Sequence, residues 1–143
     1  MSAEASVAPA IDVKFLQTVP VLRIFDVAKA REFYCDFLGF QVDWEHRFEP
    51  GLPMYMQVSR GTLRFHLSEH HGDGSPGAHV FVEMTGIEGF HREVTDRGYK
   101  FMKPGLKDEF YGARSMNVID PFGNRISFNE YKRTSPDAHS NST

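Results

Sequence analysis

The chain has 143 residues, and 16 Lys and Arg against 19 Asp and Glu give it a formal net charge of −3. A chain of this length forms one compact domain or two halves of one, and the lack of positive charge argues against binding to nucleic acid. Hydrophobic residues make up 41% of the chain, which is enough for a core and excludes global disorder. The single cysteine, Cys35, excludes an intramolecular disulfide and a cysteine-based zinc cluster.

The two ends differ in composition from the body of the chain. Residues 1–12 are small and polar, and residues 132–143 are rich in Ser, Thr, Asn, Asp and His, so we expect flexible tails there. No run of about 18 apolar residues occurs, which excludes a membrane-spanning helix. The first ten residues lack the charged start and apolar block of a secretory signal. We therefore expect a cytoplasmic protein with one folded domain over residues 13–131.

The body divides at a stretch rich in Gly and Pro, residues 70–77, which predicts a linker or a long turn. On each side of it the pattern is similar: a short apolar strand, a helix that ends at a glycine, and then further strands. In the first part we predict a strand over residues 18–24 and a helix over residues 27–38. Asp26 is the expected N-cap of this helix, and Gly39 is its expected end.

In the second part we predict a strand over residues 78–84 and a helix over residues 86–97 that ends at Gly98. Each helix has one apolar face, formed by Val27, Ala30, Phe33, Phe37 and Leu38 in the first and by Ile87, Phe90 and Val94 in the second. This order of elements predicts an α+β fold of two βαβββ modules, over about residues 16–71 and 78–131.

The predicted strands alternate between apolar and polar side chains, as half-buried strands do. In Leu63–Ser68, for example, every second residue is apolar. We expect the apolar face to lie under the helices. The opposite face carries Tyr55, Arg64, His66, His79, Phe81, Glu83 and Ser127. Such a face is either plain solvent surface or the lining of a cleft, and its mixture of aromatic and polar groups favours a cleft.

Two aromatic segments outside these positions have two interpretations each. Trp44 follows two apolar residues at strand spacing, so it is either a half-buried strand residue or a wall on which a flat ligand can stack. Phe110 and Tyr111 lie in a long predicted loop between Met102 and Ser115, and they either close the core or contact a ligand. The chain has no nucleophile signature, no phosphate-binding glycine loop and no dinucleotide fingerprint, so we identify no catalytic residue.

Two segments, Val19–Phe40 and Tyr111–Ile126, carry a further signal. The second contains an Asp-Pro-Phe-Gly-Asn turn at residues 120–124. Together they resemble the opening and closing signatures of the vicinal-oxygen-chelate superfamily, which includes glyoxalase I, extradiol dioxygenases and bleomycin-resistance proteins. The resemblance implies that the paired βαβββ modules form a curved, half-open mixed sheet around a groove, with the helices on the outer face. This agrees with the fold that the pattern of elements predicts.

The metal-dependent enzymes of this superfamily hold their metal at four positions, which correspond here to Val19, His66, His79 and Ser127. Val19 cannot bind a metal and Ser127 is a poor ligand, whereas a catalytic zinc site generally has three protein ligands. We therefore expect no metal and no cofactor. The alternative is a glyoxalase-like or dioxygenase-like metal enzyme that uses His66, His79 and, as a third ligand on the same strand face as His79, Glu83.

The bleomycin-resistance branch of the superfamily resembles this chain more closely. Its members lack the metal ligands, and they have an apolar residue followed by proline where the enzymes place a ligand, as in Val19-Pro20. This resemblance implies a homodimer that sequesters a small-molecule or glycopeptide ligand such as bleomycin in a groove at the subunit interface, without modifying it. The residues expected to contact the ligand are Trp44, Tyr55, Arg64, His66, His79, Phe81, Glu83, Phe110, Tyr111 and Ser127.

Overall fold

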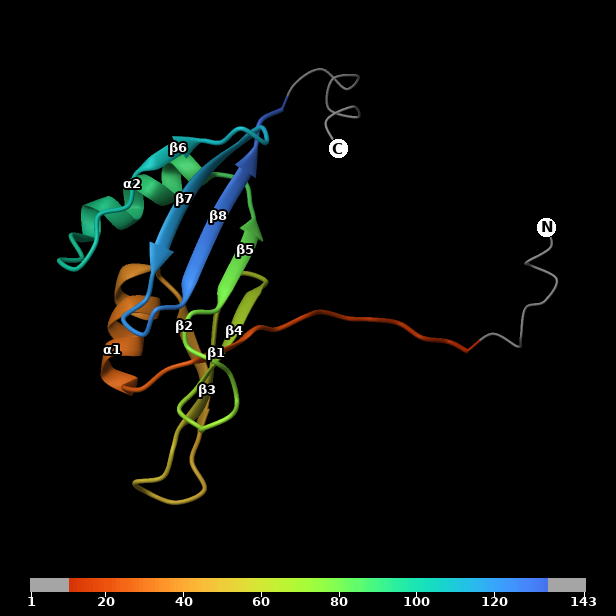
Figure 1. Ribbon diagram of the computed structural model, residues 1–143, viewed down its shortest axis with the longest axis vertical. Helices are drawn as coiled ribbons and strands as arrows, with labels where there is room; N and C mark the ends of the chain where they lie inside the picture. The colour runs from red at the N-terminus through yellow and green to blue at the C-terminus, as the bar shows by residue number, and fades with distance from the viewer. Residues whose placement is uncertain (1–10, 134–143) are drawn as a thin grey trace.

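The structure is a computed structural model, and it describes residues 11–133. The chain forms two four-stranded mixed sheets (Figure 1), in the strand orders β1-β4-β3-β2 and β5-β8-β7-β6. In each sheet the first strand is parallel to the last, and the other pairs are antiparallel. This confirms the predicted α+β fold of two βαβββ modules. The predicted tails lie outside the described residues, apart from residues 11–12 and 132–133.

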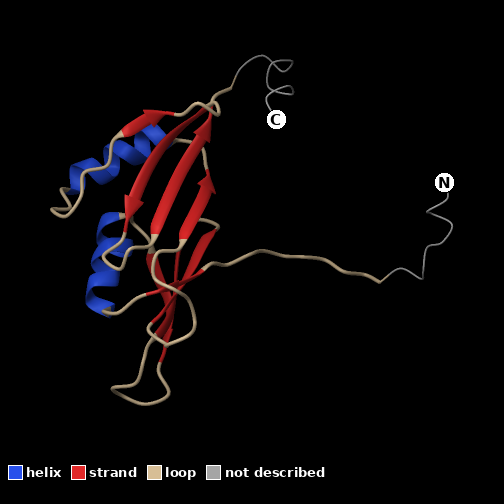
Figure 2. Ribbon diagram, viewed as in Figure 1, coloured by secondary structure: helices blue, strands red, loops and turns tan. Residues whose placement is uncertain are grey.

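The helices lie on one side of the two sheets (Figure 2). The first module contains β1 (Val21–Arg23), α1 (Val27–Arg31), η2 (Glu32–Phe37), β2 (Gln41–His46), β3 (Tyr55–Arg60) and β4 (Leu63–Ser68). The second contains β5 (His79–Glu83), α2 (Ile87–Arg97), β6 (Leu106–Asp108), β7 (Ala113–Ile119) and β8 (Arg125–Tyr131). The long loop predicted between Met102 and Ser115 is wrong in part, because β6 and the start of β7 occupy much of it. No helix within residues 11–133 is long and apolar enough to cross a membrane.

The first helical segment is a short α-helix that continues as a π-helix. The Asp26 carboxylate accepts a hydrogen bond from the Lys29 N–H at 2.9 Å, which confirms the predicted N-cap. Over η2 the turn widens, and the Leu38 N–H donates to the Phe33 carbonyl, five residues back. Gly39, with a φ of +81°, ends the segment as predicted.

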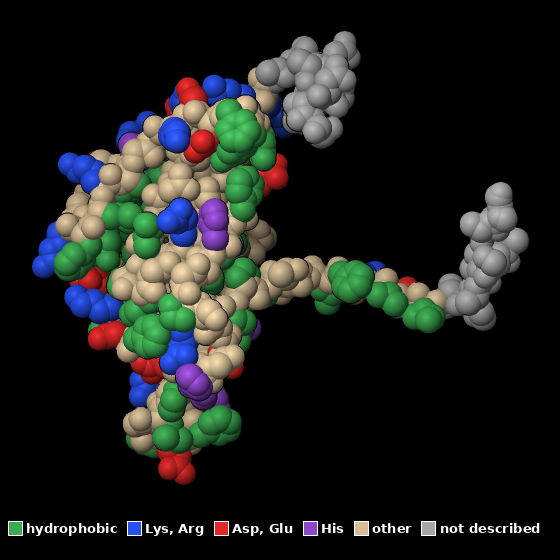
Figure 3. Space-filling model, viewed as in Figure 1, with side chains coloured by type: hydrophobic (Ala, Val, Ile, Leu, Met, Phe, Trp, Pro, Cys, Tyr) green, Lys and Arg blue, Asp and Glu red, His purple; other side chains and the backbone are tan. Residues whose placement is uncertain are grey.

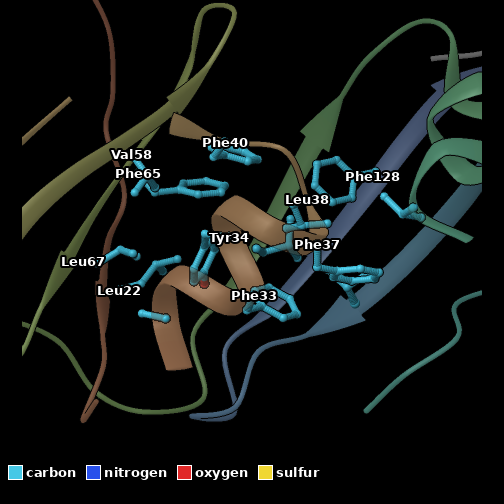
Figure 4. Close-up of a cluster of buried hydrophobic side chains, with 14 of the residues drawn as sticks. Leu22, Phe33, Tyr34, Phe37, Leu38, Phe40, Val58, Phe65, Leu67 and Phe128 are labelled. Carbon is cyan, nitrogen blue, oxygen red and sulfur yellow. The ribbon is translucent and has the colours of Figure 1, made fainter. Parts of the chain in front are cut away.

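One hydrophobic core runs through both modules (Figure 4). The turn at residues 120–124, here called the closing turn, connects the two modules. Its buried Asp120 accepts hydrogen bonds from Tyr34 Oη at 2.7 Å and from Asn124 Nδ2 at 2.8 Å. Asn124 Nδ2 also donates to the Arg23 carbonyl at 2.8 Å, and Asn124 Oδ1 accepts from the Ala78 N–H at 3.3 Å. The turn therefore joins the first helix, β1 and the start of β5. Tyr34, which the predicted apolar face omitted, is fully buried.

Two arginines join α2 to the first module. Arg60 of β3 donates two hydrogen bonds of 2.8 Å to Glu93 of α2, and its Nη1 also donates to the Leu38 carbonyl at 2.8 Å. Arg97 donates to the Phe37 carbonyl at 2.9 Å and forms an ion pair with Glu93. Hydrogen bonding from Arg60 lowers the pKa of Glu93. These contacts satisfy carbonyls at the end of η2 that have no partner in their own helix.

Candidate functional site

The predicted site residues lie on the side of the sheets that faces away from the helices. In the first sheet, the register of β3 against β4 places Gln57 beside His66, while Val58 beside Phe65 forms part of the core. In the second sheet, β5 and β8 pair so that Phe81 lies beside Ser127. In the view of Figure 3, histidine side chains reach the surface in both halves of the molecule.

A β-bulge in β2 turns Trp44 towards this face. The pairing of β2 with β3 shifts between Val42, which lies opposite Val58, and Trp44, which lies opposite Gln57. Asp43 is the extra residue of the bulge, so Trp44 does not share the face of Val42. With regular alternation, the side chains of Val42 and Trp44 would lie on the same face of the strand. Trp44 is therefore a strand residue whose side chain lies on the helix-free face and is 42% exposed, which is compatible with both interpretations of this residue.

Trp44, Tyr55 and His66 form one aromatic cluster. The rings of Trp44 and Tyr55 are stacked, with centroids 6.0 Å apart and planes 9° apart. His66 presents its ring edge-on to both, at 5.3 Å from Trp44 and 5.2 Å from Tyr55. Partly exposed parallel rings of this kind offer a surface for flat or cationic groups.

A chain of hydrogen bonds connects this cluster to Asp43. Gln57 Nε2 donates to Asp43 Oδ2 at 2.8 Å, and Ser59 Oγ donates to Asp43 Oδ1 at 3.0 Å. The other end of the Gln57 amide, Oε1, lies 3.0 Å from His66 Nε2, and His66 Nδ1 lies 2.8 Å from Tyr55 Oη. Neither Asp43 nor Gln57 was predicted as a site residue. The strand alternation places Gln57 on this face, but Asp43 depends on the bulge.

The surroundings of these groups shift their ionisation. Hydrogen bonds from Gln57 and Ser59 lower the pKa of the Asp43 carboxyl, so it is ionised at neutral pH. Burial lowers the pKa of His66, which favours the neutral imidazole. Burial, and to a lesser extent the charge of Asp73, raises the pKa of Tyr55, so its hydroxyl keeps its proton.

The residues present do not fit a metal ion of the kind that the superfamily's enzymes use. Both ring nitrogens of His66 are engaged in hydrogen bonds. Within residues 11–133, no three His, Cys, Asp or Glu side chains lie close enough to hold a metal ion. The alternative ligand set of His66, His79 and Glu83 is therefore not brought together.

The second sheet carries a separate cluster around Tyr111. Tyr111 Oη donates to Asn129 Oδ1 at 2.7 Å, and Asn129 Nδ2 donates to Ser127 Oγ at 2.9 Å. The Tyr111 ring contacts those of Phe81 and Phe110, with centroids 6.2 Å and 5.3 Å away. Phe81 is 50% exposed and Phe110 is 99% exposed, whereas Ser127 is buried. Ser127 therefore supports this cluster from beneath and presents no group at the surface.

The remaining predicted residues are exposed side chains at the edges of the two clusters. Arg64 lies on β4 in the first sheet, and His79 and Glu83 lie on β5 in the second, on either side of Phe81. Of the predicted residues, only Glu83 lines the cavity of about 550 Å³ that lies between α2, β5 and the β3–β4 turn. The two aromatic clusters are open surfaces apart from this cavity.

Comparisons with known proteins show the family and agree with the fold. A sequence profile described as "Glyoxalase superfamily protein" matches residues 3–135. Bleomycin resistance proteins of Geobacillus stearothermophilus and Staphylococcus aureus are each 32% identical, over 79% of this chain and 95% of theirs. The bleomycin-binding protein from Streptomyces verticillus, solved with copper(II)-bleomycin, is 30% identical with a TM-score of 0.63, over 84% of this chain and 99% of that chain. The bleomycin resistance determinant encoded on transposon Tn5 has a similar fold, with a TM-score of 0.64 at 20% identity over 83% of this chain and all of that one.

Proposed function

The chain belongs to the glyoxalase and bleomycin-resistance superfamily, and we propose that it sequesters a drug or another small molecule without modifying it. The observation that carries the proposal is the pair of exposed aromatic clusters, around Trp44 and Tyr111, on the helix-free side of the sheets. Ligand sites combine aromatic walls with a few placed polar groups, and this face has both. The relatives named for binding or resisting bleomycin make that drug the first ligand to test.

A homodimer, with the groove closed between two copies, is part of the proposal. Residues 11–16 run away from the body of the molecule (Figure 1). Three of their apolar side chains are almost fully exposed, with 81% for Ile11, 93% for Phe15 and 85% for Leu16. Several large apolar side chains exposed on one segment are typical of a surface that packs against another chain.

The free edge of β5 is a place where such a segment can pair. β5 is an outer strand of its sheet, and Ala78 and Met84 make their backbone hydrogen bonds to β8. In a parallel ladder the alternate residues His79, Phe81 and Glu83 then direct their backbone groups away from β8. An extended segment of a second copy can add to this edge as a further strand. Light scattering is expected to give about twice the 16.3 kDa chain mass, and a monomer at tens of micromolar would contradict the dimer.

Calorimetric titration with metal-free bleomycin tests the binding function. We expect one drug per subunit with a dissociation constant in the micromolar range or tighter, which corresponds to about −8 kcal/mol or better. The drug should be recovered with its mass unchanged, because no catalytic group was identified. Trp44 is the only tryptophan of the chain, so quenching of its fluorescence reports binding at the first cluster.

Two alanine variants make the test specific to this face. Trp44→Ala removes the exposed ring that stacks on Tyr55, and it should weaken binding at least tenfold. Phe101→Ala is the matched control, because Phe101 is also exposed (58%) but packs near Lys29 of α1, on the helix side. Equal affinity in wild type and Trp44→Ala would contradict the proposed site. No heat and no quenching with bleomycin would remove the drug as the ligand.

A further inference from the structure

We propose that the Tyr55 hydroxyl offers a ligand a hydrogen-bond acceptor and no donor, so that the surface beside Trp44 selects flat groups that carry an N–H or O–H donor. This inference rests on the proposed function, because it concerns the ligand of the same face. It follows from the direction of the hydrogen bonds in the chain that joins Asp43, Gln57, His66 and Tyr55.

The direction is set at Asp43. An ionised carboxylate only accepts hydrogen bonds, so the Gln57 group that lies 2.8 Å from Asp43 Oδ2 must be its NH₂ group. The orientation of the Gln57 amide is therefore determined by chemistry as well as by shape. Its carbonyl oxygen consequently points to His66, at 3.0 Å from Nε2.

The Gln57 carbonyl determines which ring nitrogen of His66 carries the proton. A carbonyl oxygen only accepts, so His66 Nε2 must carry the hydrogen that Gln57 receives. A neutral imidazole has one N–H, which leaves Nδ1 as an acceptor. The atom 2.8 Å from Nδ1 is Tyr55 Oη, so Tyr55 must donate its proton to His66.

Tyr55 has then used its only proton. Its phenolic oxygen keeps acceptor capacity, and every proton in the chain points towards the negative charge on Asp43. Hydrogen bonds in series polarise one another, which strengthens the oxygen of Tyr55 as an acceptor. Tyr55 is only partly buried, and its ring is stacked on that of Trp44, 42% exposed. A flat ligand that stacks on these rings with a donor at its edge would satisfy this oxygen, whereas an acceptor at that point would meet lone pairs.

Nitrogen NMR of the His66 ring tests the proton assignment without any ligand. At pH 7.5 the wild type should show the neutral Nε2–H tautomer, identified by the signal that disappears in His66→Gln. In Gln57→Leu the acceptor that orients the ring is lost, and the tautomer should become mixed. A neutral Nδ1–H tautomer or a charged ring in the wild type would overturn the inference, even if bleomycin binds.

A pair of neutral probes tests the consequence for binding. Indole and benzofuran are flat bicycles of nearly the same shape, but only indole carries an N–H donor. Followed by shifts of the Trp44 side-chain signals, indole should bind about two- to tenfold more tightly, the ratio expected for one hydrogen bond. Tyr55→Phe should abolish this preference while keeping the affinity for benzofuran, and the control Tyr99→Phe should retain it. Equal binding of the two probes, or no binding of either at Trp44, would overturn the inference.

Discussion

Replacement of Tyr34 by Phe is expected to lower the free energy of unfolding by about 1.5–3 kcal/mol, the range for a hydrogen bond to a charged group. Tyr34 Oη donates to Asp120 Oδ2 at 2.7 Å, and both residues are buried, so no water can replace the lost donor. Burial and the neighbouring Asp120 raise the pKa of Tyr34 well above its usual range, so the hydroxyl is a donor at any working pH. The phenylalanine ring keeps the edge contacts with Phe33 and Phe65, so the loss reports the hydroxyl alone.

Urea unfolding curves of Tyr34→Phe and of Tyr99→Phe provide the comparison. Tyr99 is partly buried and stacks on Phe37 at the edge of the core, but its hydroxyl has no hydrogen-bond partner among residues 11–133. Loss of the Tyr99 hydroxyl should lower the free energy of unfolding by less than about 0.5 kcal/mol. For a chain of this size the melting temperature of Tyr34→Phe should fall by roughly 5–10 °C. Equal losses in the two variants would refute the reasoning that the buried link between the first helix and the closing turn stabilises the fold.

Three further predictions concern stability and pH. Gly39→Ala should lower the free energy of unfolding in urea by about 1–3 kcal/mol, because φ is +81° and the new Cβ would lie 2.7 Å from Arg60 Nη1. The control Gly51→Ala should lower it less, because φ is also positive, at +88°, but no atom lies within 4 Å of the new Cβ. Asp26→Ala removes the cap of α1 and should cost about 1 kcal/mol, whereas Asp26→Asn should be nearly neutral. Because burial lowers the pKa of His66 in the folded state, the unfolded chain binds more protons, so stability should fall as the pH drops below about 6.5 and level off below the folded pKa. His66→Gln should lose this slope.

The order of elements could be predicted because its signals are local. Gly39 and Gly98 both have left-handed φ values, +81° and +65°, at the ends of the two helices, as their position after an apolar helix face predicts. The π-helical turn of η2 could not be predicted, because the same side chains also satisfy an α-helical pattern. β6 was missed because its three residues, Leu106–Asp108, are too few to show an alternation.

Regular strand alternation predicted which side chains of the candidate site share one face, but it could not predict the orientation of Trp44. Tyr55, His66 and Phe81 lie on the predicted face because of this alternation. Trp44 reaches this face because of the bulge at Asp43. The alternation of apolar and polar residues does not reveal where a strand contains an extra residue, so the sequence could not predict this bulge. The bond between Asp43 and Gln57 joins residues 14 positions apart, and it depends on the register that the bulge creates.

The same pair of strand positions occurs in both modules, but the large and the small side chain change places between them. The pairing of β1 with β4 places Val21 beside His66, and the pairing of β5 with β8 places Phe81 beside Ser127. In the first module the large imidazole of His66 therefore lies beside the smaller Val21. His66 is part of the chain of hydrogen bonds that ends at the Tyr55 oxygen, which is an acceptor. In the second module the small hydroxyl is buried, and the large ring beside it stays half exposed. Under the proposed function, the two halves are not interchangeable: a ligand that spans both would place a hydrogen-bond donor against the first and an apolar surface against the second.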